Sequence, residues 1–271
     1  MKVKKVFPFS LWLLVLCFFL AACGGDGGGS SSGGGGNGGG GSSPTTSNDS
    51  PGKIPGLGNT SGNLQGTSFA LPSGVTLVGS IGVAGVNGKS FLTFQSAEGK
   101  VKALKDLIKN INIVDGNYNA QIGSGWVPIV LTLKNSTTGA IKVTFPARLI
   151  LRPRNNQYQD TVLLKEASVT IPSQQNYTIV LVMYCGNLNR LGLDGTGYEW
   201  GVISNSTTLT DLTDRLVHKQ INVEDFAGYY DINNYSDRWQ KLQDILWNLT
   251  DNGVALSDAD KQWIASIPNT P

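Results

Sequence analysis

A tract that is almost without side chains divides this chain into two different parts. Between Gly24 and Gly41, 13 of 18 residues are glycine, and serine and threonine dominate the next ten residues. Such a composition buries too little apolar surface to offset the entropy of an ordered chain. We therefore expect residues 23–66 to be a disordered Gly/Ser-rich linker and residues 67–271 to hold the globular part.

The first 22 residues have the features of an export signal. Lys2, Lys4 and Lys5 form a positive end, and an apolar run from Val6 to Ala22 follows. Pro8 and Ser10 interrupt this run, which leaves it too short for a comfortable membrane span of about 20 apolar residues. The pattern favours a signal peptide over residues 1–22. An ordinary signal with a chance cysteine after it, or an uncleaved anchor, remains the alternative.

The end of this segment, Leu20-Ala21-Ala22-Cys23, resembles the lipobox of bacterial lipoproteins. The resemblance implies cleavage before Cys23, a diacylglyceryl group on its thiol and acylation of the new amino terminus. Acyl chains contribute about 0.8 kcal/mol per buried methylene, so two or three acyl chains anchor a protein firmly in the membrane, which is the partner expected here. The implied location is the bacterial cell envelope. In a double-membraned cell the resemblance implies the outer membrane, because Gly24 rather than Asp follows the cysteine.

Charge argues against a nucleic-acid partner. The chain has a formal charge of +2, and loss of the three lysines in residues 1–22 changes it to −1 for the mature form. No other basic block exists that could supply the electrostatic footprint of a nucleic-acid binder.

Cysteine and histidine usage argues against common catalytic and metal chemistries. Cys17 leaves with the signal and Cys23 carries lipid, so Cys185 is the one remaining thiol and neither a disulfide nor a zinc knuckle is expected. His218 is the single histidine, and helical periodicity places it opposite an apolar stripe, on the surface. The carboxylates of residues 231–237 lack the glycine and glutamate of a calcium loop. We predict no enzyme activity, no catalytic residues, no metal and no cofactor.

Hydrophobic periodicity predicts strands first and helices afterwards. Ile141, Val143 and Phe145 alternate with polar residues, and Tyr177–Cys185 is apolar on both faces, as in a strand covered on both sides. Further short apolar runs are separated by turn residues: Val127–Leu133, Leu149–Leu151, Val162–Leu164 and Val169–Ile171. One amphipathic helix is expected between Val101 and Ile111.

After Cys185 the pattern becomes helical. Leu209, Leu212 and Leu216 form one stripe, Ser236 is a candidate cap for a second helix ending near Gly253, and a capping box at Ser257 opens a third that ends before Pro268. The expected fold is α+β, with an antiparallel, sandwich-like β region followed by a helical region. A boundary between two sub-units is possible near residues 186–206.

One glutamine lies on the wrong side of the second helix. With Trp239 at 0° on a helical wheel, Gln243 falls at about 40°, between Leu246 and Trp247 on the apolar face. A buried carboxamide without partners costs about 1–3 kcal/mol. The fold must therefore supply hydrogen-bond partners for Gln243.

Two short motifs resemble those of bacterial surface thioester domains. Tyr184-Cys185 ends an apolar strand, and Leu242-Gln243-Asp244-Ile245-Leu246-Trp247 has the apolar-Gln-x-x-apolar pattern of that family, within residues Tyr177–Asn252. The resemblance implies that the Cys185 thiolate displaces ammonia from Gln243 to form an internal thioester, which a nucleophile on a host surface can open. Gly186 departs from the family, in which an apolar residue is common after the cysteine.

Three functions remain open from the sequence. The first is a non-enzymatic binding or structural module of unknown ligand, with Cys185 as a small buried hydrophobe and Gln243 bonded to a backbone group. The second is a covalent adhesin that uses Cys185 and Gln243. The third is a glycan-binding module with an aromatic platform drawn from Trp200, Tyr229, Tyr230 and Tyr235.

Overall fold

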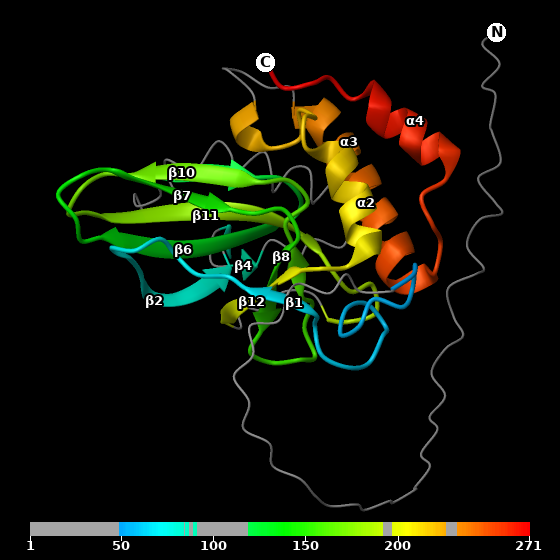
Figure 1. Cartoon of the computed structure of the whole chain (residues 1–271), viewed down its shortest axis with the longest axis horizontal. Helices are drawn as coiled ribbons and strands as arrows, with labels where there is room; N and C mark the ends of the chain where they lie inside the picture. The colour runs from blue at the N-terminus through cyan, green and yellow to red at the C-terminus, as the bar shows by residue number, and fades with distance from the viewer. Residues whose placement is uncertain (1–48, 84, 87–88, 91–118, 192–196, 226–231) are drawn as a thin grey trace, which may run out of the picture. The chain divides into compact units, whose positions relative to one another are not determined.

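The computed structural model describes residues 49–271, except for residues 84, 87–88, 91–118, 192–196 and 226–231 (Figure 1). The predicted signal peptide, Cys23, the glycine tract and the predicted helix of residues 101–111 therefore lie outside the described residues.

The centre of the domain is a closed ring of six strands rather than the expected sandwich of two sheets. The ring runs through β2 (Val75–Val83), β6 (Val127–Asn135), β11 (Asn176–Cys185), β9 (Thr161–Val162), β8 (Leu149–Pro153) and β12 (Tyr198–Ser204). β12 pairs with both β2 and β8, and these two pairings close the ring. All ring pairings are antiparallel. The coarse expectation of an antiparallel β region followed by helices is confirmed.

Shorter strands extend this barrel. β1 (Gly66–Ser68) pairs with β12, and β5 (Ala120–Gly123) runs parallel to β11. β7 (Ile141–Phe145) and β10 (Ala167–Ile171) form a separate antiparallel pair, as do β3 (Gly85–Val86) and β4 (Lys89–Ser90). β11 is buried from Ile179 to Cys185, which confirms that this part of its apolar run is covered on both faces; Tyr177 is half-buried.

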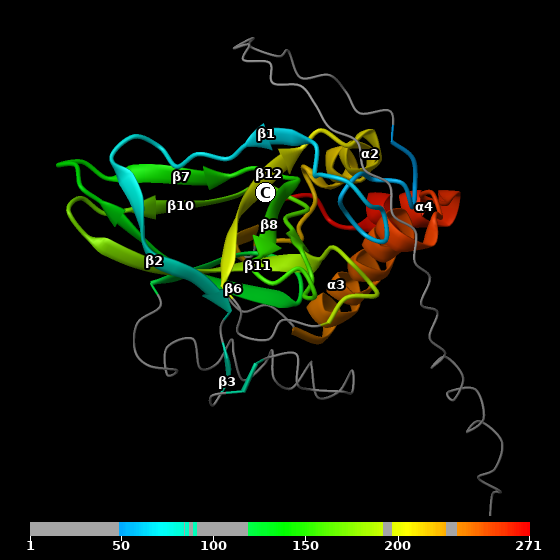
Figure 2. The ribbon, with the colours of Figure 1, turned by 90° about the horizontal axis from the view of Figure 1, so that it is seen from below.

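The helices gather at one end of the barrel (Figures 1 and 2). They are α2 (Thr207–Leu216), the short turn η2 (Val223–Asp225), α3 (Ile232–Trp247) with a π-helical end at Asn248–Asn252, and α4 (Asp258–Ser266). Leu209, Leu212 and Leu216 are buried, and Gly253 ends α3 with a left-handed φ of 69°, as predicted. The capping box of Ser257 is also confirmed. Ser236, by contrast, lies inside α3, which already includes Ile232.

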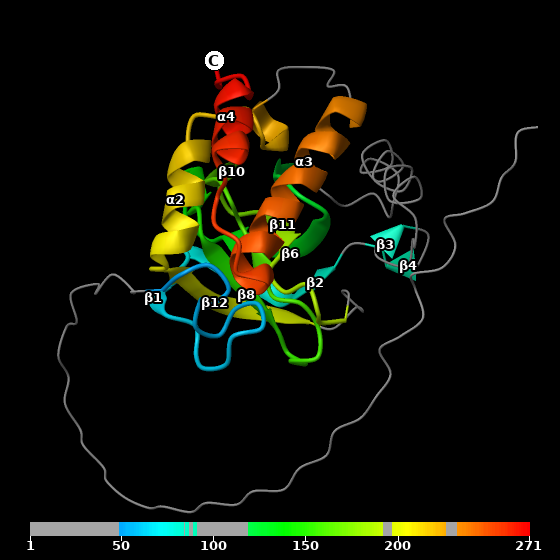
Figure 3. The ribbon, with the colours of Figure 1, turned by 90° about the vertical axis from the view of Figure 1, so that its right-hand side faces the viewer.

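The expected linker boundary at residue 66 differs from the structure. Asp49 accepts hydrogen bonds from the backbone N–H groups of Thr207 and Thr208 at the start of α2, at 3.0 and 3.3 Å. Ile54 and Leu57 are buried in the same apolar cluster as the helices. We call residues 49–65 the N-terminal strap; it passes beside the ends of α2 and α3 (Figure 3). Two apolar side chains hold it to the domain in a segment whose composition is otherwise that of a linker.

The region of the suspected sub-unit boundary contains a barrel strand. β12 occupies residues 198–204 and pairs with β1, β2 and β8, so these residues belong to the barrel and do not separate two sub-units. Among the helices of the described residues, none is both long and apolar enough to cross a membrane.

Candidate functional site

The candidate site lies at the end of β11, beyond the last residue that pairs with β6. β6 pairs with β11 only as far as Met183, opposite Val127, and the N–H of Trp126 donates to the carbonyl of Met183. Backbone groups of alternate residues point to the same side of a strand. The N–H and C=O of Cys185 therefore point to the side from which β6 is already missing.

The side chain of Gln243 replaces the missing strand at this position. The N–H of Cys185 donates to Oε1 of Gln243 at 2.8 Å, and Nε2 of Gln243 donates to the carbonyl oxygen of Cys185 at 2.8 Å. Gln243 is 2% exposed and Cys185 5% exposed. The burial predicted for Gln243 is thus confirmed, and both of its polar atoms are satisfied by the backbone of Cys185, 58 residues away in the sequence.

Helix α3 holds Gln243 in place through its apolar face. Trp239, Leu242 and Leu246 are fully buried in the cluster between the helices and the barrel, while Asp244 is exposed. Trp239 meets the ring of Trp126 edge-on, with 6.5 Å between centroids. This packing fixes the rotation of α3 about its axis, so that Gln243 is aimed at the end of β11.

The end of β11 lies between two apolar clusters of the core. Tyr184 belongs to the cluster beneath the helices, whereas Cys185 belongs to the cluster of the barrel, together with Tyr198. This is the alternation expected of a strand. Burial raises the pKa of the Tyr198 hydroxyl well above its usual range, and the nearby Cys185 and Asp160 add to that effect. The described cysteine forms no disulfide.

The structure also explains the glycine that follows the cysteine. A Cβ on Gly186 would lie 2.9 Å from Cδ1 of Leu57 in the N-terminal strap and 3.2 Å from the carbonyl oxygen of Asp160. Leu57 therefore occupies the space into which a side chain at this position would extend.

A buried charge cluster adjoins this glycine. Asp160 is fully buried, and its two carboxylate oxygens pair with Arg152 Nε at 3.3 Å and Arg190 Nη1 at 2.9 Å. Its backbone N–H donates to Asn187, and its carbonyl accepts from the N–H of Gly186. Burial raises the pKa of Asp160 above its ordinary value, although both arginines oppose the shift.

The other predicted residues do not join this site. His218 is exposed, as expected. Trp200 stacks into a cluster with Phe69, 4.8 Å away, and Phe145, 6.3 Å away, and is half-buried there. Tyr229 and Tyr230 lie outside the described residues, and for Tyr235 only the helical backbone position is described. Within the described part of the chain, no group of three or more metal-ligating side chains gathers.

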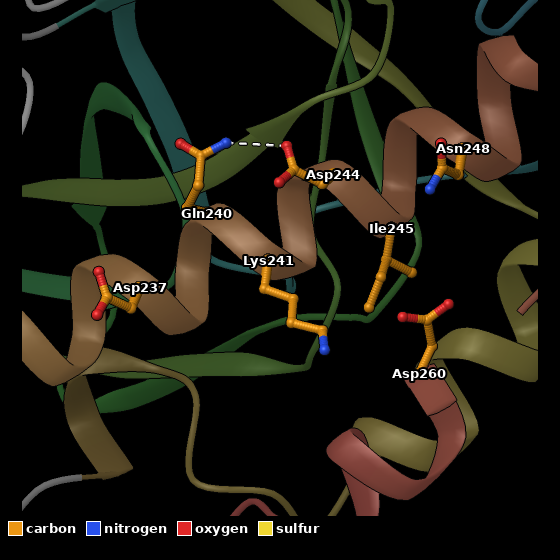
Figure 4. Close-up of a pocket in the computed structure, with 7 residues that line it drawn as sticks. All are labelled: Asp237, Gln240, Lys241, Asp244, Ile245, Asn248 and Asp260. Atoms are coloured by element: carbon orange, nitrogen blue, oxygen red, sulfur yellow. Dashed lines mark hydrogen bonds between the residues drawn. The ribbon is translucent and has the colours of Figure 1, made fainter. Parts of the chain in front are cut away.

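The opposite side of α3 has a shallow groove of about 400 Å³ (Figure 4). Asp237 and Asp244 on α3 and Asp260 on α4 line it, and Lys241 lies 4.6 Å from the ring centroid of Trp263. Figure 4 shows a bond from Gln240 to Asp244, which is 2.9 Å long. The groove is lined by charged side chains in contact with solvent, and α3 separates it from Gln243.

Sequence reasoning missed the Asp160 cluster and the strap. Arg152, Asp160 and Arg190 are isolated charges in the sequence, and the pairings of β9 with β8 and with β11 bring them together. Arg152 follows three consecutive apolar residues in its strand, so no alternating pattern marks it.

No protein-family model matches the chain, and searches of curated proteins and of solved structures also gave no match.

Proposed function

We propose that this chain is a lipid-anchored, exported protein of the bacterial cell envelope that attaches covalently to a partner through an internal thioester between Cys185 and Gln243. The reciprocal hydrogen-bond pair between these two residues is the observation that carries the proposal. Two motifs chosen from the sequence for this chemistry meet across 58 residues of chain. The lipobox at Leu20–Cys23 supports the anchor and the location.

The contact brings the Gln243 carboxamide to the backbone of Cys185, and thioester formation further requires the Cys185 sulfur to reach Cδ. The Cys185 sulfur attacks Cδ of Gln243, so that an S–C bond forms while the C–N bond breaks. The nitrogen leaves as ammonia and takes up the thiol proton, so atoms and charges balance. The N–H of Cys185 already donates to Oε1, where negative charge develops during the attack, and such a preorganised donor stabilises the transition state.

Opening of the thioester follows the same path with another nucleophile. A primary amine attacks Cδ, an amide bond to Gln243 forms, and the sulfur leaves as the Cys185 thiol after proton transfer from the amine. One turnover joins the protein permanently to its partner, so this is covalent binding and not enzymatic catalysis.

A non-covalent binding or structural module is the second candidate, and the same contact favours it. In that account, Gln243 serves only to satisfy the orphaned N–H and C=O of Cys185, which would cost about 1–3 kcal/mol each if left unpaired in the core. The two candidates differ in a single observable, the presence of the S–C bond.

Intact-mass analysis separates the two candidates. The sample is the mature chain with Cys23→Ser, which removes the acylation site and leaves Cys185 as the single cysteine. The thioester makes the native protein lighter by one ammonia than its sequence, and methylamine converts it to an adduct on Gln243. Cys185→Ala and Gln243→Ala should each restore the full mass. A full mass in the unmutated protein, with no methylamine adduct, would disprove the thioester and leave the non-covalent module.

The anchor is tested separately. The full precursor should take up a palmitate analogue during growth and fractionate with membranes. Cys23→Ser should abolish both, and uptake that survives this change would rule out Cys23 as the acylated residue.

A further inference from the structure

Two arginines beside the candidate site are held in position by a carboxylate that solvent cannot reach. Asp160 is 0% exposed, whereas the side chains of Arg152 and Arg190 are 33% and 25% exposed. Each guanidinium contacts a different oxygen of Asp160 through one nitrogen. The cluster therefore presents two cations on one buried anion and has a net positive charge.

Most of the donor capacity of these arginines is not used within the described protein. A guanidinium has five N–H donors in a rigid fork, and one nitrogen of each arginine is engaged here. In the described residues, no second ion pair is made by either side chain. Fixed, partly exposed guanidinium groups bind carboxylates through charge-assisted, often paired hydrogen bonds. Glu199 is the cross-strand neighbour of Arg152 but forms no ion pair with it in the described structure.

The backbone of Asp160 is hydrogen-bonded to the two residues that follow Cys185. Thr161, the residue after Asp160, is the cross-strand partner of Cys185. The carbonyl of Asp160 accepts from Gly186 N–H at 2.8 Å, and its N–H donates to Asn187 Oδ1 at 2.8 Å. Asp160, which pairs with both arginines, is thus next to the cross-strand partner of the thioester cysteine.

We infer that Arg152 and Arg190 form a docking site for a carboxylate of an acidic protein segment, and that this site selects the lysine that reacts with Gln243. This inference rests on the proposed function for the covalent step. The thioester needs an amine nucleophile, and protein segments carry lysines beside acidic side chains. An acidic polysaccharide usually offers carboxylates without an amine, and therefore fits the pair of sites less well.

The test compares two synthetic peptides on the mature chain with Cys23→Ser. Both have one lysine and a blocked amino terminus; in one the flanking residues are glutamate, and in the other they are glutamine. We expect the glutamate peptide to form the adduct about tenfold faster, which corresponds to one or two charge-assisted contacts. Added salt should reduce the preference, because the arginines are partly exposed.

Arg152→Gln and Arg190→Gln should each reduce the preference to about threefold or less, by removal of one charge-assisted contact. Methylamine carries no carboxylate, so its rate of adduct formation should stay the same in both variants. This readout separates docking from a structural effect on the thioester. Arg152→Gln is the safer variant for folding, because its bond to Asp160 is the longer one and Arg190 remains paired. Arg215→Gln is the matched control: it removes an equally charged, exposed arginine on α2, paired only with Asp211 in the described structure.

Equal rates for the two peptides, or the same loss of preference in Arg215→Gln, would overturn the docking site while leaving the thioester intact. If intact mass shows no thioester, the proposed function fails, and fluorescence anisotropy with labelled peptides then tests docking by itself. Tighter binding of the glutamate peptide that is lost in Arg190→Gln supports the site; equal binding of both peptides refutes it. Binding of polygalacturonate but not of the glutamate peptide would refute the choice of a protein partner.

Discussion

Gln243 should stabilise the fold even when it cannot react. The test substitution is Gln243→Met in a Cys185→Ala background, where no thioester can form and the backbone of residue 185 is retained. Methionine has nearly the length of glutamine and fills the same space, but it cannot take the place of the missing strand beside β11. The change therefore removes the two hydrogen bonds of 2.8 Å and little else.

The expected loss follows from the burial of both partners. After substitution, the N–H and C=O of residue 185 stay buried without partners, and each such group costs about 1–3 kcal/mol. The more apolar methionine offsets part of this by its own burial, on the order of 1 kcal/mol. The net loss should be about 1–5 kcal/mol, a large fraction of the roughly 5–15 kcal/mol typical of a domain.

Urea unfolding followed by tryptophan fluorescence measures this loss, because Trp126 and Trp239 are buried beside the site. The control is Gln240→Met, on the same helix, whose side chain bonds Asp244 near the surface and no other described residue. That variant should stay within about 0.5 kcal/mol of its parent. If Gln243→Met costs no more than Gln240→Met, the view that Gln243 completes the edge of β11 is wrong.

Three further outcomes are expected. Methylamine should lower the free energy of unfolding of the Cys23→Ser chain by about 4 kcal/mol, because opening the thioester releases a crosslink that spans 58 residues; no change in the urea midpoint would mean that no crosslink existed. A chain that starts at residue 67 should melt well below one that starts at residue 49, since it lacks two buried side chains of the strap, each worth about 2–5 kcal/mol; equal melting temperatures would place the domain boundary back at residue 66. Burial raises the pKa of Glu224 from 4.5 to about 7, so between these two pH values the native state keeps a proton that the unfolded chain loses. The free energy of unfolding should therefore fall as pH rises through this range. In urea titrations at several pH values, Glu224→Gln should remove that part of the fall.

Periodicity predicted the elements whose burial is repetitive. β7 alternates strictly, β11 is apolar without interruption from Ile179 to Cys185, and α2 has leucines at helical spacing. Each of these patterns predicts its type of element within a few residues. The same argument predicted the burial of Gln243, because a polar residue inside an apolar face is visible on a helical wheel. Its partner Cys185 was suggested only by the resemblance to thioester domains, since no local signal joins residues 58 apart.

The features that the sequence did not reveal depend on distant partners. β12 reads as a mixture of charged, aromatic and glycine residues, and it becomes a strand because it pairs with β2 and β8 on either side. Closure of the barrel, and hence the difference from a sandwich, depends on this one strand. The strap has two buried apolar residues, Ile54 and Leu57, among turn-forming residues, which is too few for any periodic pattern.

The strap also determines how the domain would take up a mechanical load from a membrane anchor. Tension on the segment before Asp49 first acts on the bonds from Asp49 to the start of α2, and then on the bond between Gly52 N–H and the carbonyl of Leu249. These contacts are loaded one after another, whereas the barrel strands share a load among many bonds. Release of residues 49–65 would add about 60 Å of extended chain, at roughly 3.3–3.6 Å per residue. Under force applied through the proposed anchor, the strap would thus lengthen before the barrel itself is loaded.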